Sequence, residues 1–141
     1  MASLIYDSFM DDLVRGKFNF DGDTIRVMLV MDAYVPNKGL HAKRSDVKSE
    51  VGVNNTGYAT GGLSTTPALT LDVATHRMDI SFSNVTWSNA TITAKAAVLY
   101  KSNGGAANED ELIAYVDFGQ NVSSTAEAFA VTFPCALRLQ N

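Results

Sequence analysis

The sequence has one cysteine, two histidines and no long apolar run. The single cysteine, Cys135, cannot form an intramolecular disulfide or a multi-cysteine metal site. Because it lies in the apolar run AVTFPCALRL, we expect it to be a small buried hydrophobic residue. A transmembrane helix needs about 18 or more consecutive apolar residues, and no such run is present. The sequence therefore predicts no disulfide, no cysteine-based metal site and no membrane partner.

The chain also lacks a surplus of basic residues and a secretory signal. Its 11 lysines and arginines are outnumbered by 15 acidic residues, which gives a formal net charge of -4. Proteins that bind nucleic acids usually carry a concentrated basic surface, so we expect no nucleic-acid partner. The start MASLIYDSFMDDL has no basic segment followed by a long apolar one. We expect the chain to be made in a cytoplasm.

Residues suited to catalysis or metal binding are few. His41 lies in a polar stretch and His76 in the turn ATHRMD, and they lack the i, i+2 or i, i+4 spacing of a metal-binding pair. No G-x-S-x-G elbow, P-loop or dinucleotide-binding glycine motif is present. The DGD at residues 21–23 fails as the start of a calcium loop, because Ile25 stands where an oxygen ligand is needed. The sequence predicts no enzymatic activity, no cofactor and no metal.

The composition is that of a folded domain. Hydrophobic residues make up 46% of the chain and charged residues 18%, which is far from the pattern of disordered proteins. A chain of 141 residues is the usual size of one domain and buries enough apolar surface to fold without disulfides. We expect a single β-rich domain over residues 1–141.

Apolar spacing predicts one helix and many strands. In residues 3–15, SLIYDSFMDDLVR, apolar residues recur at helical spacing, with Ser3 as N-cap and Gly16 as the stop. We expect the apolar stripe of this helix to pack on the domain's own sheet or, alternatively, on another subunit. The segment TIRVMLVM is apolar on both faces and predicts a central strand.

Residues 67–141 are rich in strand-like segments. Apolar and polar residues alternate in ALTLDV, RMDISF, ATITAKAAVLYK, ELIAYVDF and AFAVTF, and the first two segments are joined by a tight turn typical of a hairpin. With only one strong helix in the chain, this pattern predicts a mainly β protein. We expect an antiparallel β-sandwich or barrel-like sheet with an N-terminal helix.

A long segment at about residues 32–66 interrupts the strands. Its prolines, glycines and asparagines indicate a loop, and its middle, KRSDVKSEV, is compatible with a short helix capped by Ser45. Long loops in compact domains usually carry function or an ordered excursion. One hypothesis is that this loop contacts a partner, with Lys43 and Arg44 meeting acids and Tyr34 and Tyr58 as aromatic anchors. The alternative is that it folds back over its own sheet.

Three consecutive acids, Glu109, Asp110 and Glu111, follow the glycine-containing connection SNGGAAN. The flanking segments VLYK and ELIAYVDF are strand-like, so the acids are predicted to lie at the tip of a β-hairpin. Unpaired charge is costly to bury, and we expect these side chains to face water. The alternative is a contact with a basic neighbour, including one on another subunit.

Several stretches carry a resemblance to a known family. VMLVMDAYVPNKGLHAKRSDVKSEV, TGYATGGL and WSNATITAKAAVLYKSNGGAANEDELIAYVDFG are similar to small proteins encoded among the virion structural genes of tailed bacteriophages. The likeness extends over nearly the whole chain, and it brings no catalytic signature. It implies a virion component made in the cytoplasm of a host bacterium.

The resemblance implies first a decoration or cement protein on the exterior of the head, with the major capsid protein as partner. The alternative is a tail or head-to-tail accessory protein that contributes to host recognition. Either role works through repeated weak contacts, so we expect a symmetric homo-oligomer or many copies on the particle. A third class, a small hydrolase, is disfavoured because the chain has no motif for that chemistry.

Overall fold

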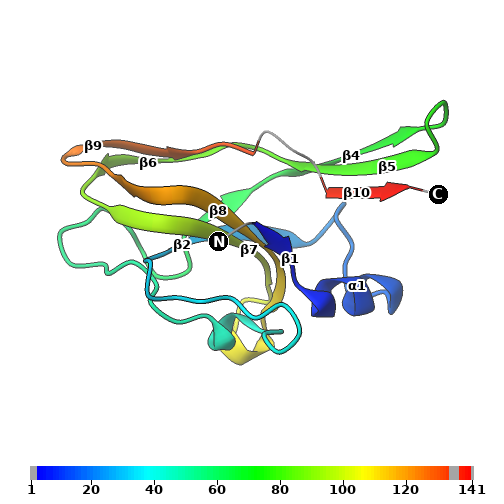
Figure 1. Cartoon of the computed structure of the whole chain (residues 1–141), viewed down its shortest axis with the longest axis horizontal. Coiled ribbons are helices and arrows are strands. Elements are labelled where there is room, and N and C mark those ends of the chain that lie inside the picture. The colour runs from blue at the N-terminus through cyan, green and yellow to red at the C-terminus, as the bar shows by residue number, and fades with distance from the viewer. Residues whose placement is uncertain (1–2, 134–136, 141) are drawn as a thin grey trace.

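The computed structural model describes residues 3–133 and 137–140, and this part of the chain forms a mainly β protein (Figure 1). The strands pair antiparallel in three sheets, which confirms the predicted fold class. The elements are β1 (Leu4–Ile5), α1 (Asp7–Val14), β2 (Thr24–Val30), β3 (Leu63–Thr65), β4 (Pro67–Asp72), β5 (Arg77–Phe82), β6 (Val85–Ala90), β7 (Thr93–Ser102), β8 (Glu111–Ser123), β9 (Glu127–Val131) and β10 (Leu137–Gln140), with 3-10 turns at Arg44–Asp46 and Ala107–Glu109. Cys135, predicted to be buried, lies outside the described residues.

The largest sheet has the strand order β1-β8-β7-β2-β3 and is apolar on both faces. In β2, Val27 and Leu29 face one side of the sheet, while Met28 and Val30 face the other. This confirms that the TIRVMLVM segment is apolar on both faces. As predicted, β2 is an interior strand, paired with β7 on one side and β3 on the other, although β7 holds the middle position of the sheet.

One face of this sheet is covered by a second layer of strands. The two-stranded sheet β6-β9 contributes Trp87 and Phe129, and the inner part of β5 contributes Ile80 and Phe82. Aromatic rings continue this core toward α1, where Phe9 packs edge-on against a neighbouring phenylalanine. The result is the two-layered, sandwich-like arrangement visible in Figure 1.

The other face is covered by the first part of residues 31–62, a stretch that we call the covering segment. Its later residues Val51 and Tyr58 pack in the core between the two strand layers. Tyr34 and Val47 of this segment are buried against apolar side chains of the sheet, among them Val98. The segment also bonds to strand backbones, since the Leu112 N–H donates to the Ala42 carbonyl at 3.1 Å. Of the two predicted alternatives for the long loop, the structure shows the one in which it folds back.

The covering segment differs from the prediction in two details. Residues 63–65, expected to be loop, form β3 and pair with β2. The short helix expected in KRSDVKSEV is only a 3-10 turn at Arg44–Asp46, because Ser49 and the following residues leave helical geometry to bridge to β2. A single glycine ends the segment: Gly62 has φ +77°, and a Cβ there would lie 1.8 Å from the Val27 carbonyl oxygen.

The N-terminal helix is shorter than predicted. Residues 4–5 form β1 on the edge of β8, and the Asp117 N–H donates to the Ser3 hydroxyl at 2.8 Å, so Ser3 is not the N-cap. Pairing with the open edge of β8 gives hydrogen-bond partners to the backbone N–H and C=O groups of residues 4–5. In the first turn of a helix, the N–H groups would have no partner within the helix. Gly16 ends the helix with φ +78°, as expected. Phe9 packs into the protein's own core, while Met10 remains 56% exposed.

Strands β4 and β5 form the predicted hairpin, and β10 adds to the free side of β5. We call this three-stranded sheet the arm, because it extends beyond the body of the protein at one end (Figure 1). Four strands, β1, β3, β6 and β10, were not predicted, since they are short or carry polar residues at most positions.

Candidate functional site

The two tyrosines proposed as anchors for a partner are buried within the chain. Tyr34 is 4% exposed, and its hydroxyl lies 2.8 Å from that of Tyr6 and 2.9 Å from Nδ1 of His41. Tyr58 is 3% exposed, donates to Oε2 of Glu50 at 2.6 Å and accepts from the Leu29 N–H at 3.1 Å. Burial raises the pKa of both phenols. In this conformation neither ring is available as an anchor, because each side chain supports the covering segment.

The three acids do not behave alike. Glu109 is exposed, as expected for a solvated tip. Asp110 and Glu111 are 2% and 8% exposed, so they do not face water; for them the structure shows the alternative, a contact with a basic neighbour. Oδ2 of Asp110 lies 2.8 Å from Nε of Arg44, and its Oδ1 accepts from the Asn103 N–H at 2.9 Å. A buried carboxylate is stable when it is paired and hydrogen-bonded, and both conditions hold here.

The basic residues proposed to meet a partner's acids meet these acids instead. Arg44 pairs with Asp110 and lies over the ring of Tyr100, 5.3 Å from its centroid. Burial acts to lower the pKa of Arg44, but the hydrogen bond to Asp110 and the nearby charges raise it above its usual value. Nζ of Lys43 lies 3.6 Å from Oε1 of Glu111. These pairs join the covering segment to the start of β8, so they act within the chain.

The histidines lie in different parts of the structure. In the covering segment, Nδ1 of His41 accepts from the Asn37 N–H at 3.1 Å, while His76 occupies the hairpin turn of the arm with φ +55°. Among residues 3–133 and 137–140, no three side chains of the histidine, cysteine, aspartate or glutamate type are grouped to hold a metal ion. Within the same residues, no helix has the length and apolar character to cross a bilayer.

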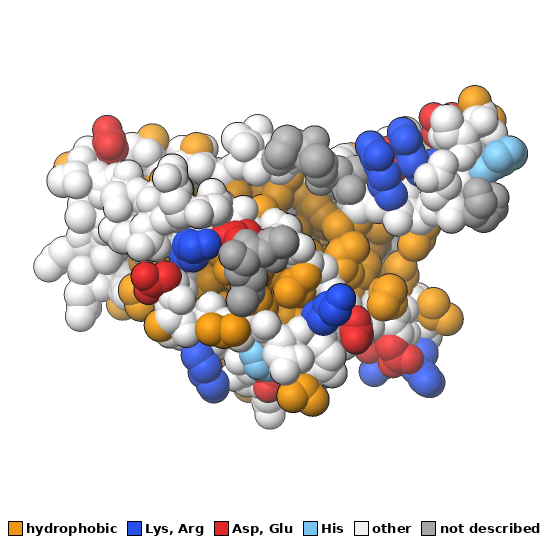
Figure 2. All heavy atoms as spheres, viewed as in Figure 1, with side chains coloured by type: hydrophobic (Ala, Val, Ile, Leu, Met, Phe, Trp, Pro, Cys, Tyr) orange, Lys and Arg blue, Asp and Glu red, His pale blue; other side chains and the backbone are white. Residues whose placement is uncertain are grey.

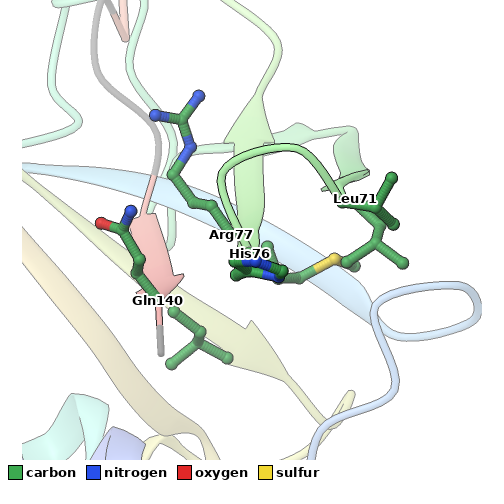
Figure 3. A pocket seen from close by; sticks show the side chains of 7 residues that line it. Leu71, His76, Arg77 and Gln140 are labelled. Carbon is green, nitrogen blue, oxygen red and sulfur yellow. The ribbon is translucent and has the colours of Figure 1, made fainter.

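The arm exposes an apolar face. Leu71 and Leu139 pair with Met78 from its two sides, and Val73 follows at the start of the turn. Leu71 is 67%, Val73 73% and Leu139 53% exposed. Together with His76 they line an open hollow of about 460 Å³ at the outer end of the arm, and Figure 3 shows Leu71 and His76 at its edge.

A larger groove lies between the arm, α1 and β8, and it has a volume of about 840 Å³. Its floor is the side of β8 that faces the second strand layer, including Val116 and Phe118. Ile5 and Met10 border the groove on one side and Leu137 on the other. Hydrophobic side chains gather in this hollow between the arm and the helix (Figure 2). We refer to the arm's apolar face and this groove together as the arm-groove surface.

Sequence reasoning missed this surface. The alternation of Leu69, Leu71 and Val73 predicts a strand with one apolar side. The four residues before the C-terminal asparagine, LRLQ, also alternate, which was the available signal for β10. Neither pattern states whether anything covers the apolar side.

Comparisons with protein-family models, with curated proteins and with solved structures find no match to this chain. The arm-groove surface is therefore interpreted from its own geometry and chemistry.

Proposed function

We propose that the chain is a non-enzymatic structural component of a tailed-bacteriophage virion. In this proposal it is a decoration protein on the exterior of the head, made in the cytoplasm of the host bacterium and bound to the major capsid protein. The observation that supports a binding role is the arm-groove surface, which exposes apolar side chains that isolated soluble domains usually cover. The assignment to a virion rests on the sequence resemblance.

The arrangement of polar groups supports binding over chemistry. Arg44 and Asp110 pair with each other, and Tyr58 and Glu50 bond to each other and to the backbone. These contacts fix the covering segment on the sheet and give a rigid body. A rigid body with an apolar surface loses little conformational entropy when it binds, which favours weak contacts repeated over a symmetric particle.

The shape of the arm supports one second candidate, a tail or head-to-tail accessory protein that contributes to host recognition. The arm extends from one end of the protein (Figure 1), and its turn carries Val73 and His76 away from the core. Such an extension is able to reach a second, unlike protein while the body stays attached to the first. The major capsid protein would then not be the main partner.

The test is to locate the protein on the particle. Phage heads lacking the protein are incubated with purified wild-type chain, and bound copies are located by cryo-electron microscopy and counted by quantitative mass spectrometry. The decoration proposal predicts regularly spaced density on the head exterior and a copy number that follows the capsid symmetry. Density confined to the tail or its junction would support the second candidate, and absence from purified virions would overturn both.

A further inference from the structure

The apolar face of the arm and the groove form one continuous surface. Leu137 lines the groove and Leu139 lines the hollow at the end of the arm. These two residues lie on the same side of β10, because residues two apart in a strand share a face. Their cross-strand partners are Ile80 and Met78 of β5. Ile80 is buried in the protein's core. The next row of cross-strand neighbours outward, Leu71, Met78 and Leu139, is therefore the part of the arm that extends past the body.

The opposite face of the arm is polar, and its charges are paired. Oδ1 of Asp79 lies 3.1 Å from Nε of Arg77 and 3.4 Å from Nε of Arg138. Asp72 accepts a hydrogen bond from the Ala74 N–H in the turn. The strand alternation therefore separates the arm into a charged face that suits water and an apolar face that does not.

The exposed apolar area is large enough for a specific interface. The side chains that contribute to it are Ile5, Met10, Leu69, Leu71, Val73 and Leu139. They expose roughly 500 Å², which is in the range of the largest apolar patches on soluble monomers. A standard interface covers about 800 Å² on each partner, and about 60% of that area is apolar. The arm-groove surface thus matches one side of a stable dimer.

We propose that two copies of this chain associate through this surface, with the arm of each copy seated in the groove of the other. Each copy presents the exposed apolar side chains of its projecting arm, around Leu71 and Leu139, and one apolar groove, bordered by Met10. A two-fold axis lets the arm of each copy occupy the groove of the other in a single reciprocal contact. The paired charges of Asp79 and Arg138 stay on the opposite face of each arm, away from the contact. The groove also carries Asp7 and Lys38, and the end of the arm carries Arg77, so polar contacts border the apolar one.

This inference deepens the proposed function, because the dimer would be the form that binds a phage particle. Only that link to the particle rests on the proposed function. Self-association is measured on the purified protein without any particle. A monomer that still binds heads would overturn this inference and leave the proposed function intact. A dimer that binds no part of the virion would do the reverse.

The first experiment is sedimentation velocity of the full chain from low to high micromolar concentration. We expect a reversible monomer–dimer equilibrium in the wild type. The arm variant carries Leu71→Asp and Val73→Asp, and the groove variant carries Met10→Asp. Each should raise the dimer Kd by about a hundredfold or more, because apolar contacts are lost and a carboxylate is desolvated. Leu40→Asp is the matched control, since Leu40 is 78% exposed in the covering segment, outside the surface.

The second experiment mixes the two variants. The arm variant has an intact groove and the groove variant has an intact arm. The mixture should therefore form a heterodimer at concentrations where each variant alone is monomeric. Circular dichroism verifies that each variant is folded. A monomeric wild type at every concentration, or a groove variant that dimerises like wild type, would overturn the proposal. Failure of the mixture to associate would also overturn it, because packing of arm on arm predicts that result.

Discussion

The covering segment and the arm differ from their sequence patterns in opposite ways: residues expected at the surface are buried in the first, and a face typical of a buried sheet is exposed in the second. The covering segment is irregular and carries the residues expected to face a partner, yet Tyr34 and Tyr58 are buried in it and Arg44 is paired internally. The arm has the clear alternation of a half-buried sheet, yet Leu71 and Val73 on its apolar face are largely exposed. Periodicity therefore tells which residues share a face, and the surroundings decide whether that face is covered.

The largest effect is expected where the covering segment ends. Gly62→Ala would place a Cβ 1.8 Å from the Val27 carbonyl oxygen at φ +77°, so β2 or the segment has to move. We expect a loss of about 4 kcal/mol or more in the free energy of unfolding, or failure to fold. The measurement is urea denaturation followed by circular dichroism.

Gly104→Ala is the matched control, because Gly104 also has φ +77° but has open space around it. Its cost should be only about 1 kcal/mol, from the left-handed backbone alone. Equal effects of the two substitutions would show that the close approach to Val27 does not matter.

The next effect concerns the buried acid. Asp110→Ala removes the partner of Arg44 and the acceptor of the Asn103 N–H, and it leaves a guanidinium that is mostly out of water. We expect a loss of about 3 kcal/mol in the free energy of unfolding. Glu109→Ala, at the exposed neighbouring position, should change it by less than about 0.5 kcal/mol. If both substitutions were neutral, the acids would be a solvated tip after all.

Tyr58→Phe tests the hydrogen bonds that join the later part of the covering segment to β2. The change removes one hydroxyl that donates to Glu50 and accepts from the Leu29 N–H, and it leaves the ring against Trp87. Because a buried N–H loses its acceptor, we expect a cost of about 1–2 kcal/mol. Hydrogen exchange at the Leu29 amide should accelerate more than exchange elsewhere in β2. Uniform acceleration along the strand would contradict this local explanation.

Lowering the pH should reduce the contribution of the covering segment to the stability of the fold. The N–H groups of Ala42 and Lys43 donate to Oδ2 of Asp46 and lower its pKa below the usual 3.8. A carboxylate whose pKa is lower in the folded state than in the unfolded state stabilises the fold at any pH above its unfolded-state pKa. This contribution is lost as the pH falls through the folded-state pKa. We expect the melting temperature of Asp46→Asn to fall less than that of wild type as the pH is lowered below about 4. Parallel pH curves would exclude a contribution from Asp46.

The smallest effect is expected in the arm. Leu71→Ser should change the free energy of unfolding by no more than about 0.5 kcal/mol at concentrations where the chain is monomeric, because the side chain is already exposed. Ile80→Ala, on the same face but one row closer to the body, should cost about 2–5 kcal/mol because Ile80 is 3% exposed. Thermal melts of the dilute proteins compare the two. A large cost for Leu71→Ser would show that the outer row is covered.

Much of the fold follows from local patterns in the sequence. The apolar run in TIRVMLVM and the alternation in ALTLDV and ELIAYVDF identified strands. Gly16 identified the end of the helix, and ATH identified the turn of the hairpin. These features depend on backbone geometry and on which side chains share a face within a few residues, and a sequence contains that information directly.

The candidate site was decided by contacts between distant parts of the chain. Arg44 and Asp110 are 66 positions apart, and only the folded-back covering segment brings them together. Residues 4–5 became a strand because β8 offered an open edge, although their spacing suited a helix. The outer row of the arm stays exposed because the core reaches only as far as Ile80. Burial and pairing depend on which surfaces meet in space, so they belong to the tertiary structure, while the sequence by itself determined the strands and their faces.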